Sequence, residues 1–343
     1  MSSIPHVIAE AGTNHNGCLK TAENLVDVAC AAGADSVKFQ IIYPEGLYLP
    51  RFRVNGGYIA NEVYEKRRAR MLSDDEYRRL SDFARERGLP LSASVFDARG
   101  LALLEELDAP YIKIASCDLN NTPLLKAAAA YGRKLIVSTG MASIAEIEGA
   151  VHAIASSGRT DLVLMHCVSI YPCTLERMNL SFIRTLQAAF GFPVGLSDHT
   201  ESSLAAAMGV SMGVAWIEKH FTYSRAADGF DHAYAMEPEG LSQYIRDVRQ
   251  AAAAARPAQQ KLLSEEATVK RRARRGIYAA RPIRAGEIIA EADLLVVRPE
   301  GPLALEDCPY VVGSRAVHPI AQFEAIQREQ IQKSEAVEVK KAA

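Results

Sequence analysis

Long apolar runs are missing from this chain of 343 residues. No stretch approaches the roughly 18 consecutive apolar residues that a membrane span requires. The first six residues also lack the basic region and apolar stretch of a secretory leader. We therefore expect a cytoplasmic protein that does not enter a membrane.

The chain also lacks a large net charge and closely spaced cysteine pairs of the CxxC type. The formal net charge is −2, which excludes the broadly basic surface of a nucleic-acid binder. The one basic run, residues 270–275, is better interpreted as a solvated linker helix that touches the barrel surface. Six cysteines without CxxC spacing predict reduced thiols, and Cys117 and Cys167 are expected to be small buried residues rather than nucleophiles. Small molecules are the expected partners.

Eight short apolar strands alternate with helical segments through the first two thirds of the chain. They are predicted at residues 7–9, 36–40, 91–94, 111–114, 135–138, 162–166, 193–196 and 215–219. Near-continuous apolar strands separated by helices indicate a parallel sheet, and eight repeats close it into a (β/α)8 TIM barrel. An open doubly wound sheet is the alternative, but no dinucleotide-type glycine fingerprint follows the first strand.

Helix starts are marked by short capping patterns. Ser73 and Ser143 each precede a glutamate by three residues, which predicts two capping boxes. Asp97 is a further predicted cap, and Thr122 before Pro123 has the favoured order of cap and then proline.

The domain organisation follows from the length of the chain and from the change to short β-prone segments after residue 275. We expect a barrel catalytic domain over residues 1–256, a linker over 257–275 and a small β-rich domain over 276–335. Residues 41–72 form an insertion longer than most strand-to-helix loops, which is typical of a lid over substrate.

Polar and charged residues cluster where the predicted strands end. These ends meet at one rim of a barrel, where active sites lie. The strand-end residues are Glu10, Lys38, Gln40, Ser94, Lys113, Ser116, Ser138, Ser169, His199 and His220. Because ammonium groups and hydroxyls both stabilise dense anionic oxygens, the set predicts a small phosphorylated acid as ligand.

Two of the strand-end residues are histidines. His199 and His220 follow the neighbouring seventh and eighth strands, and such a pair indicates part of a divalent-metal site with open positions for water and substrate. His166 is expected to be packed in the interior. His15 is either structural or substrate-facing.

Segments along nearly the whole chain resemble those of the sialic acid synthase family, whose members condense phosphoenolpyruvate with an acylated sugar. The segments that carry the resemblance are residues 8–17, 34–40, 111–116, 138–141, 166–172, 193–200 and 217–222. Residues 275–331 resemble the antifreeze-like (SAF) domain of the same family.

The resemblance implies a role for each site residue. Phosphoenolpyruvate would be held by Lys38, Ser94, Lys113, Ser116, Ser138, Ser169, Tyr171 and Ser197. Glu10 would be the acid/base group, and a divalent metal, manganese or else magnesium or cobalt, would bind His199 and His220. The sugar would meet Gln40, Asp118, Tyr171, Asp231 and, from the partner subunit of a domain-swapped homodimer, Arg298.

The reaction implied is the metal-dependent condensation of phosphoenolpyruvate with open-chain N-acetylmannosamine, giving N-acetylneuraminate and phosphate. A 2,4-diacetamido hexose leading to legionaminate or pseudaminate is the alternative acceptor. A catalytically silent sugar-binding protein is the alternative from another class. The chain departs from the family pattern at Ser94, at Cys117-Asp118, at Phe230 and after Arg298, and these differences concern the sugar more than the reaction.

Overall fold

The computed structural model describes residues 4–158, 161–257 and 261–333. The chain divides into two compact units, Met1–Pro257 and Ala258–Ala343. The predicted end of the second domain at residue 335, and residues 258–260 of the predicted linker, lie outside the described residues. None of the described helices combines the length and the apolar character needed to cross a membrane.

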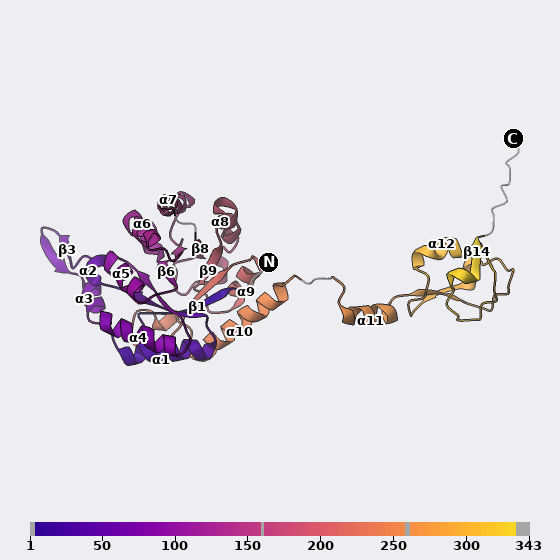
Figure 1. Cartoon of the computed structure of the whole chain (residues 1–343), viewed down its shortest axis with the longest axis horizontal. Helices are drawn as coiled ribbons and strands as arrows, with labels where there is room; N and C mark the ends of the chain where they lie inside the picture. Colours follow the sequence, from indigo (N-terminus) through magenta and orange to yellow (C-terminus); the bar gives the residue numbers. More distant parts are fainter. Residues whose placement is uncertain (1–3, 159–160, 258–260, 334–343) are drawn as a thin grey trace, which may run out of the picture. The chain divides into compact units, whose positions relative to one another are not determined.

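The first unit is a closed barrel of eight parallel strands, which confirms the predicted (β/α)8 fold (Figure 1). Its strands are β1 (His6–Gly12), β2 (Ser36–Ile41), β5 (Leu91–Val95), β6 (Tyr111–Ile114), β7 (Lys134–Ser138), β8 (Leu162–Cys167), β9 (Val194–Asp198) and β10 (Trp216–His220). They neighbour one another in the order β1-β10-β9-β8-β7-β6-β5-β2. Strand ends differ from the predicted ones by a few residues at most, because the buried apolar runs continue into polar rim residues.

Helices form a layer outside the barrel. They are α1 (Leu19–Ala32), α4 (Asp74–Glu86), α5 (Ala98–Glu106), α6 (Thr122–Ala130), α7 (Ile144–Ala155), α8 (Phe182–Phe190), α9 (Leu204–Ser211) and α10 (Pro238–Ala255). Each turns apolar side chains toward the strands, as Leu25, Leu104 and Leu186 do, and these side chains are almost fully buried. Burial of each such side chain contributes about 1.5–3 kcal/mol, so the contacts between the helices and the strands stabilise the barrel.

The capping patterns are confirmed at three of the four helix starts. Ser73 and Ser143 form capping boxes, and Asp97 accepts a hydrogen bond from the backbone N–H of Gly100. The fourth prediction was wrong: Thr122 is the first helical residue, and the Asn121 side chain accepts from the Leu124 N–H at 3.3 Å. Asparagine is among the strongest N-cap residues, so it takes the position one residue earlier.

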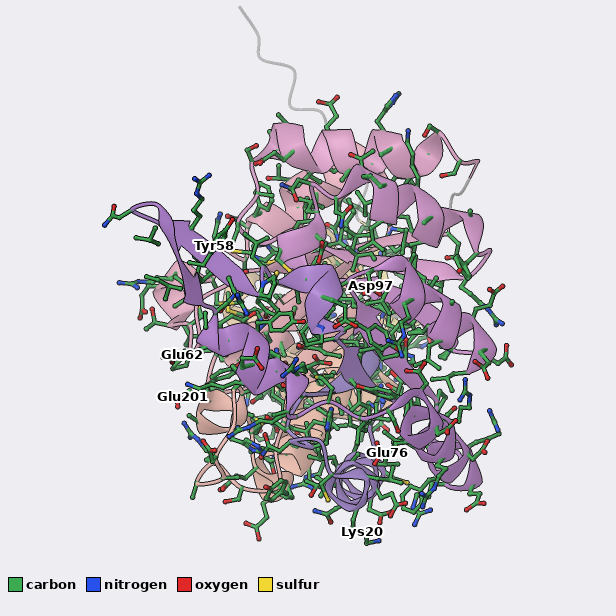
Figure 2. All side chains as sticks on the ribbon, turned by 90° about the vertical axis from the view of Figure 1, so that its left-hand side faces the viewer. Lys20, Tyr58, Glu62, Glu76, Asp97 and Glu201 are labelled. Carbon is green, nitrogen blue, oxygen red and sulfur yellow. The ribbon has the colours of Figure 1, made fainter. Side chains whose placement is uncertain are left out.

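The insertion after β2 is built of regular elements. These are α2 (Pro44–Leu47), the hairpin strands β3 (Arg51–Val54) and β4 (Gly57–Ala60), and α3 (Glu62–Arg68). Figure 2 shows the hairpin, with Tyr58, extending away from the body of the unit. Asn61 is buried and caps α3 by accepting from the Val63 N–H. The predicted role of the 41–72 insertion in enclosing substrate stays a prediction.

The second unit is small and β-rich, around its own apolar core of residues such as Ile277, Ile289 and Ile326. Its elements are α11 (Ser264–Ala273), β11 (Gly276–Ala279), β12 (Leu294–Val297), α12 (Cys308–Val311), β13 (Ser314–Ala316) and β14 (Ile331–Lys333). The basic run ends α11, where the Arg271 carbonyl accepts from the Glu300 N–H at 2.9 Å. The predicted linker helix therefore belongs to this unit.

Candidate active site

A cavity of about 340 Å³ opens at the carboxyl ends of the barrel strands. Its walls contain thirteen of the predicted site residues: Glu10, Lys38, Gln40, Ser94, Lys113, Ser116, Ser138, Ser169, Tyr171, Ser197, His199, His220 and Asp231. Eight strands thus bring together side chains that are far apart in the sequence. The individual roles expected for these residues stay predictions.

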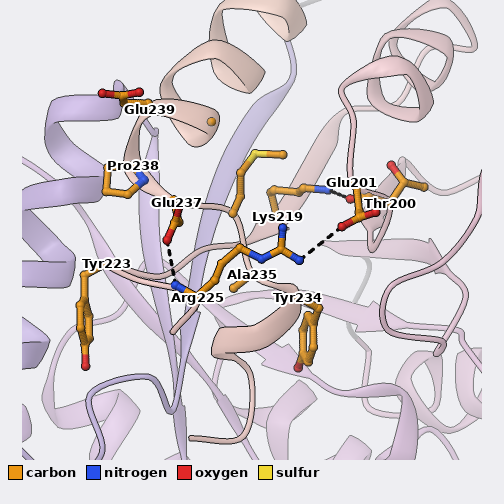
Figure 3. A pocket seen from close by; sticks show the side chains of 12 residues that line it. Thr200, Glu201, Lys219, Tyr223, Arg225, Tyr234, Ala235, Glu237, Pro238 and Glu239 are labelled. Atoms are coloured by element: carbon orange, nitrogen blue, oxygen red, sulfur yellow. Dashed lines mark hydrogen bonds and ion pairs between the residues drawn. The ribbon is translucent and has the colours of Figure 1, made fainter. Parts of the chain in front are cut away.

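A larger cavity of about 610 Å³, drawn in Figure 3, shares Tyr234 with this one. Its two basic side chains are paired within the protein. Arg225 contacts Glu201 at 3.3 Å and, through its backbone N–H, Glu237 at 2.9 Å. Lys219 donates to the carbonyls of Asp198 and Thr200. The smaller cavity is lined by buried polar atoms without a hydrogen-bond partner, His220 Nδ1 and Asp231 Oδ2 among them, and we take it as the candidate active site.

Four buried charges form the floor of this cavity. Lys38 Nζ lies 2.6 Å from Glu10 Oε2 and 3.6 Å from Glu218 Oε2, while Lys113 Nζ lies 3.8 Å from Glu218 Oε2. Each of these side chains is at most 5% exposed. Because a single buried charge costs several kcal/mol, two acids and two bases are tolerable here only as a mutually compensating set.

The environment separates the two carboxylates in proton affinity. Burial raises the pKa of Glu10 to about 7, despite the opposing charge of Lys38. Burial would also raise the pKa of Glu218, but Lys113 and Lys38 outweigh it and lower that pKa to about 2. Glu218 is therefore a fixed anion, and Glu10 is a group able to exchange a proton near neutral pH, as acid/base catalysis requires.

Each lysine is paired with a hydroxyl from the next strand of the barrel. Lys38 Nζ donates to Ser94 Oγ at 3.0 Å, and Lys113 Nζ donates to Ser138 Oγ at 2.6 Å. Burial lowers the pKa of Lys113. Ammonium groups beside hydroxyls that can still rotate offer several donors to one phosphate or carboxylate group.

The two histidines are neutral and oriented. Burial lowers the pKa of His199, and it lowers that of His220 to about 3. His199 Nδ1 donates to the Val168 carbonyl at 2.7 Å, which leaves the lone pair on Nε2, and Ser197 Oγ lies 3.2 Å from that nitrogen. His220 Nδ1 is buried without a hydrogen-bond partner, and the two rings are 5.5 Å apart.

Two neutral imidazoles, one with an orphaned nitrogen, suit a divalent transition metal. Within the described residues, no group of three or more His, Cys, Asp or Glu side chains is arranged to hold a metal ion. Water and substrate oxygens would therefore have to complete the coordination.

The residues expected to meet the sugar differ in where they lie. Gln40 Nε2 donates to Glu10 Oε1 at 3.1 Å, and the Tyr171 ring lies 4.1 Å from that of His199. Asp231 Oδ2 is buried without a partner at the cavity wall. Asp118 is absent from this wall: its Oδ1 accepts from Asn121 at 3.0 Å. Arg298 is an exposed residue of the second unit.

Several cavity residues were not predicted. Glu218 and Tyr234 are the main ones, together with Cys117 and Met141. Glu218 could have been found from the period of two along a strand, because it shares the inward face of β10 with His220. The prediction that Cys117 is buried was wrong: it is exposed, because a 3-10 turn (Ser116–Asp118) carries it out of the strand.

Two further histidines considered in the sequence, His166 and His15, have structural surroundings. His166 is buried, and its Nε2 contacts the Met178 carbonyl at 2.7 Å, which confirms the prediction of a packed histidine. His15 is fully buried near Tyr77, and its Nδ1 accepts from the Gly17 N–H at 3.0 Å. It does not line the cavity, which favours the structural alternative.

Fold and site together define a TIM-barrel enzyme built for a small anionic substrate. Comparison with known proteins narrows this class. The NeuB family profile matches residues 25–260, and the SAF domain profile matches residues 274–332. The chain therefore belongs to the NeuB family, the sialic acid synthases, and is a phosphoenolpyruvate-dependent nonulosonate synthase with a carboxyl-terminal SAF domain.

Relatives with names and structures agree with this assignment. The N,N'-diacetyllegionaminic acid synthase of Legionella pneumophila is 34% identical over 318 residues, which cover 90% of this chain and 89% of the relative. The N-acetylneuraminic acid (sialic acid) synthetase of Leptospira borgpetersenii, solved with citrate, is 31% identical with a TM-score of 0.69, over 78% of this chain and 91% of that one. The spore coat polysaccharide biosynthesis protein SpsE of Bacillus subtilis is also 31% identical, with a TM-score of 0.66 over 98% and 97% of the two chains.

Proposed function

We propose that this enzyme condenses phosphoenolpyruvate with the open-chain aldehyde of N-acetylmannosamine to give N-acetylneuraminate and phosphate. The observation that carries the proposal is the buried set of Glu10, Lys38, Lys113 and Glu218 in the same cavity as His199 and His220. One side of the cavity offers donors for a phosphorylated acid. The other offers neutral ligands and acceptors for a polyhydroxylated aldehyde.

Phosphoenolpyruvate binds on the lysine side. Lys38 and Lys113 neutralise its phosphate and carboxylate, and the hydroxyls of Ser94, Ser116, Ser138, Ser169 and Ser197, with that of Tyr171, complete the donor set. Because both lysines already point at serine hydroxyls, the ligand replaces interactions that hold the ammonium groups in place before it arrives.

The acceptor binds on the histidine side. Gln40, Tyr171 and Asp231 face its hydroxyls and acyl group, and the unpartnered Oδ2 of Asp231 is an acceptor for a sugar hydroxyl. His199 and His220 would hold a divalent metal, Mn²⁺ in the first instance. When bound, such an ion supplies Lewis-acid polarisation of a carbonyl oxygen.

The carbon–carbon bond forms when the methylene carbon of phosphoenolpyruvate attacks the aldehyde carbon, and the aldehyde oxygen takes a proton from the protonated Glu10 carboxyl group as its C=O π bond breaks. Water then adds to the cationic carbon that remains, and the Glu10 carboxylate accepts a proton from it. The tetrahedral intermediate loses phosphate by cleavage of the C–O bond, while the lysines stabilise the departing oxygens. The balance is one phosphoenolpyruvate, one aldehyde and one water giving one keto acid and one phosphate.

A 2,4-diacetamido hexose is the second candidate acceptor. The Legionella relative, named a diacetyllegionaminic acid synthase, aligns with 90% of this chain. Asp118 is also turned toward Asn121 rather than into the cavity, which removes one predicted acceptor for a sugar hydroxyl. Both observations support a sugar that differs from N-acetylmannosamine in the substituent that it places near Asp118.

The enzyme acts as a domain-swapped homodimer in this proposal. Arg298 of the second unit is exposed, so its guanidinium is open to a ligand on another subunit. There it would contact the acyl group of the sugar as a planar donor.

The test of acceptor identity is a panel of acylated hexoses. Purified enzyme with saturating phosphoenolpyruvate and Mn²⁺ is assayed for phosphate release with N-acetylmannosamine and with 2,4-diacetamido hexoses. The proposal expects the highest kcat/KM for N-acetylmannosamine, and the reverse order would establish the second candidate. No release with any acceptor would refute both.

A further inference from the structure

Helix α3, at the end of the 41–72 insertion, contacts the rim of the barrel through Arg67. The helix begins at Glu62, labelled in Figure 2. Arg67 Nη1 donates to Thr13 Oγ1 at 2.6 Å, and Thr13, in the loop after β1, is buried. The Nε atom of Arg67 is also buried, without a hydrogen-bond partner. This arginine is therefore part of the rim rather than of the solvated surface of the insertion.

The same guanidinium lies over the ring of Phe230, 3.6 Å from its centre. Phe230 belongs to the long loop after β10, and the residue after it is Asp231. A stacked arginine and aromatic ring attract each other most strongly when both are shielded from water. Arg67 thus connects the loop after β1 to the loop after β10, at the residue next to Asp231.

The Asp231 carboxylate is confined by the last residue of β1, next to Thr13, and by its own loop after β10. Gly12, with φ +55°, faces Asp231 so closely that a Cβ there would lie 2.6 Å from Oδ2. On the other side, Tyr234 donates a hydrogen bond to Asp231 Oδ1. The carboxylate therefore has little freedom as long as the two loops keep their separation.

A second contact strengthens the connection. Arg70, just beyond α3, lies 2.6 Å from Asp228 Oδ2, and its backbone packs 3.0 Å from where a Cβ of Gly17 would be. Asn16 Nδ2 donates to the Asp228 carbonyl at 2.6 Å. The Arg70 side chain is 33% exposed and that of Asp228 is 88% exposed, so solvent screens this ion pair and it contributes less than the buried contacts of Arg67.

We propose that Arg67 is a positioning residue for the acceptor: by bridging Thr13 and Phe230 it fixes the loop after β10 so that Asp231 meets the sugar. This inference rests on the proposed sugar-facing role of Asp231. It assigns the insertion a function in catalysis through α3, separate from any movement of the exposed hairpin.

The first test needs no substrate. Amide hydrogen exchange of full-length Arg67→Ala, read out by mass spectrometry, is expected to be faster over residues 224–234 and 13–17 than in the wild type. The matched control is Arg68→Ala, because Arg68 is 64% exposed and pairs only with Glu65 of its own helix in the contacts described. Exchange in Arg67→Ala equal to that of the control overturns the bridge.

The second test separates acceptor from phosphoenolpyruvate. With the acceptor that the panel identifies, Arg67→Ala is expected to raise the acceptor KM by about 10- to 100-fold and to leave the phosphoenolpyruvate KM within about twofold. Phe230→Leu should act in the same direction, and the double variant should be no worse than Arg67→Ala alone, because both remove one contact. Equal increases in both KM values, or an unchanged acceptor KM, overturn the positioning role.

Asp231→Asn distinguishes the two levels of the proposal. If it raises the acceptor KM and Arg67→Ala does not, the proposed site stands and the positioning role is wrong. If Asp231→Asn leaves the acceptor KM unchanged, the sugar-facing role of Asp231 fails, and the positioning role fails with it.

Discussion

Glu10 and Lys38 are partners in the register of neighbouring strands β1 and β2, and their side chains meet with Lys38 Nζ 2.6 Å from Glu10 Oε2. The barrel thereby buries the Glu10 carboxylate against the cation that, in the proposed function, also binds the phosphorylated substrate. A phosphate bound at Lys38 would then compete with Glu10 for that cation. The proposed acid/base group and the proposed anion site would thus be coupled through one ammonium group.

Replacing Glu218 tests whether the buried charges are a compensating set. Glu218→Gln keeps the volume but leaves Lys38 and Lys113 with one carboxylate between them, so the free energy of unfolding should fall by about 3–5 kcal/mol. Urea denaturation measures this change. The control, Asp161→Asn, breaks a pair between Lys134 and the half-exposed Asp161 and should cost less than about 1 kcal/mol. Similar costs for the two variants would show that the buried set is not compensating.

His15 should make stability dependent on pH. Burial lowers its pKa to about 4 from an unfolded value near 6.5, so the unfolded chain binds more protons between these values and stability falls as the pH drops from 6.5 to 4. The full loss is roughly 3 kcal/mol. His15→Asn keeps an acceptor for the Gly17 N–H and should lack this component. A stability difference between wild type and variant that stays constant from pH 4 to 7 would contradict the account.

Removing one imidazole tests the metal site. His199→Ala is expected to weaken Mn²⁺ binding at least about tenfold, measured by titration calorimetry, with an unchanged circular dichroism spectrum. His152→Ala, on the exposed side of α7, is the control and should bind Mn²⁺ as the wild type does. An unchanged affinity in His199→Ala would remove this residue from the site.

Complementation between subunits tests the exchanged domain. Glu10→Ala should lose about 10²- to 10⁴-fold in kcat, and Arg298→Ala should lose acceptor binding. Unfolding and refolding the two variants together should restore part of the activity, because one of the mixed sites then carries both native residues. Separate refolding followed by mixing is the control. No recovery in the co-refolded sample argues against a contact from the partner subunit.

Much of the fold and the site could be predicted from the sequence because barrel strands have a simple signature. Apolar runs such as residues 111–114 end in polar side chains, and parallel closure places those ends at one rim. What could not be predicted depends on backbone turns and loop contacts. The turn at Ser116–Asp118 takes Asp118 to Asn121, and the loop after β10 brings Tyr234 into the cavity. Neither this turn nor this loop has a periodic pattern of apolar residues from which its path could be predicted.

The condensation itself is measured most directly with phosphoenolpyruvate labelled with ¹⁸O at the bridging oxygen. The enzyme is incubated with Mn²⁺ and the acylated hexose, and phosphate and keto acid are analysed by mass spectrometry. The account predicts phosphate release only with acceptor present, one keto acid per phosphate, and the label in the phosphate. Release without acceptor, or label retained in the organic product, would contradict it.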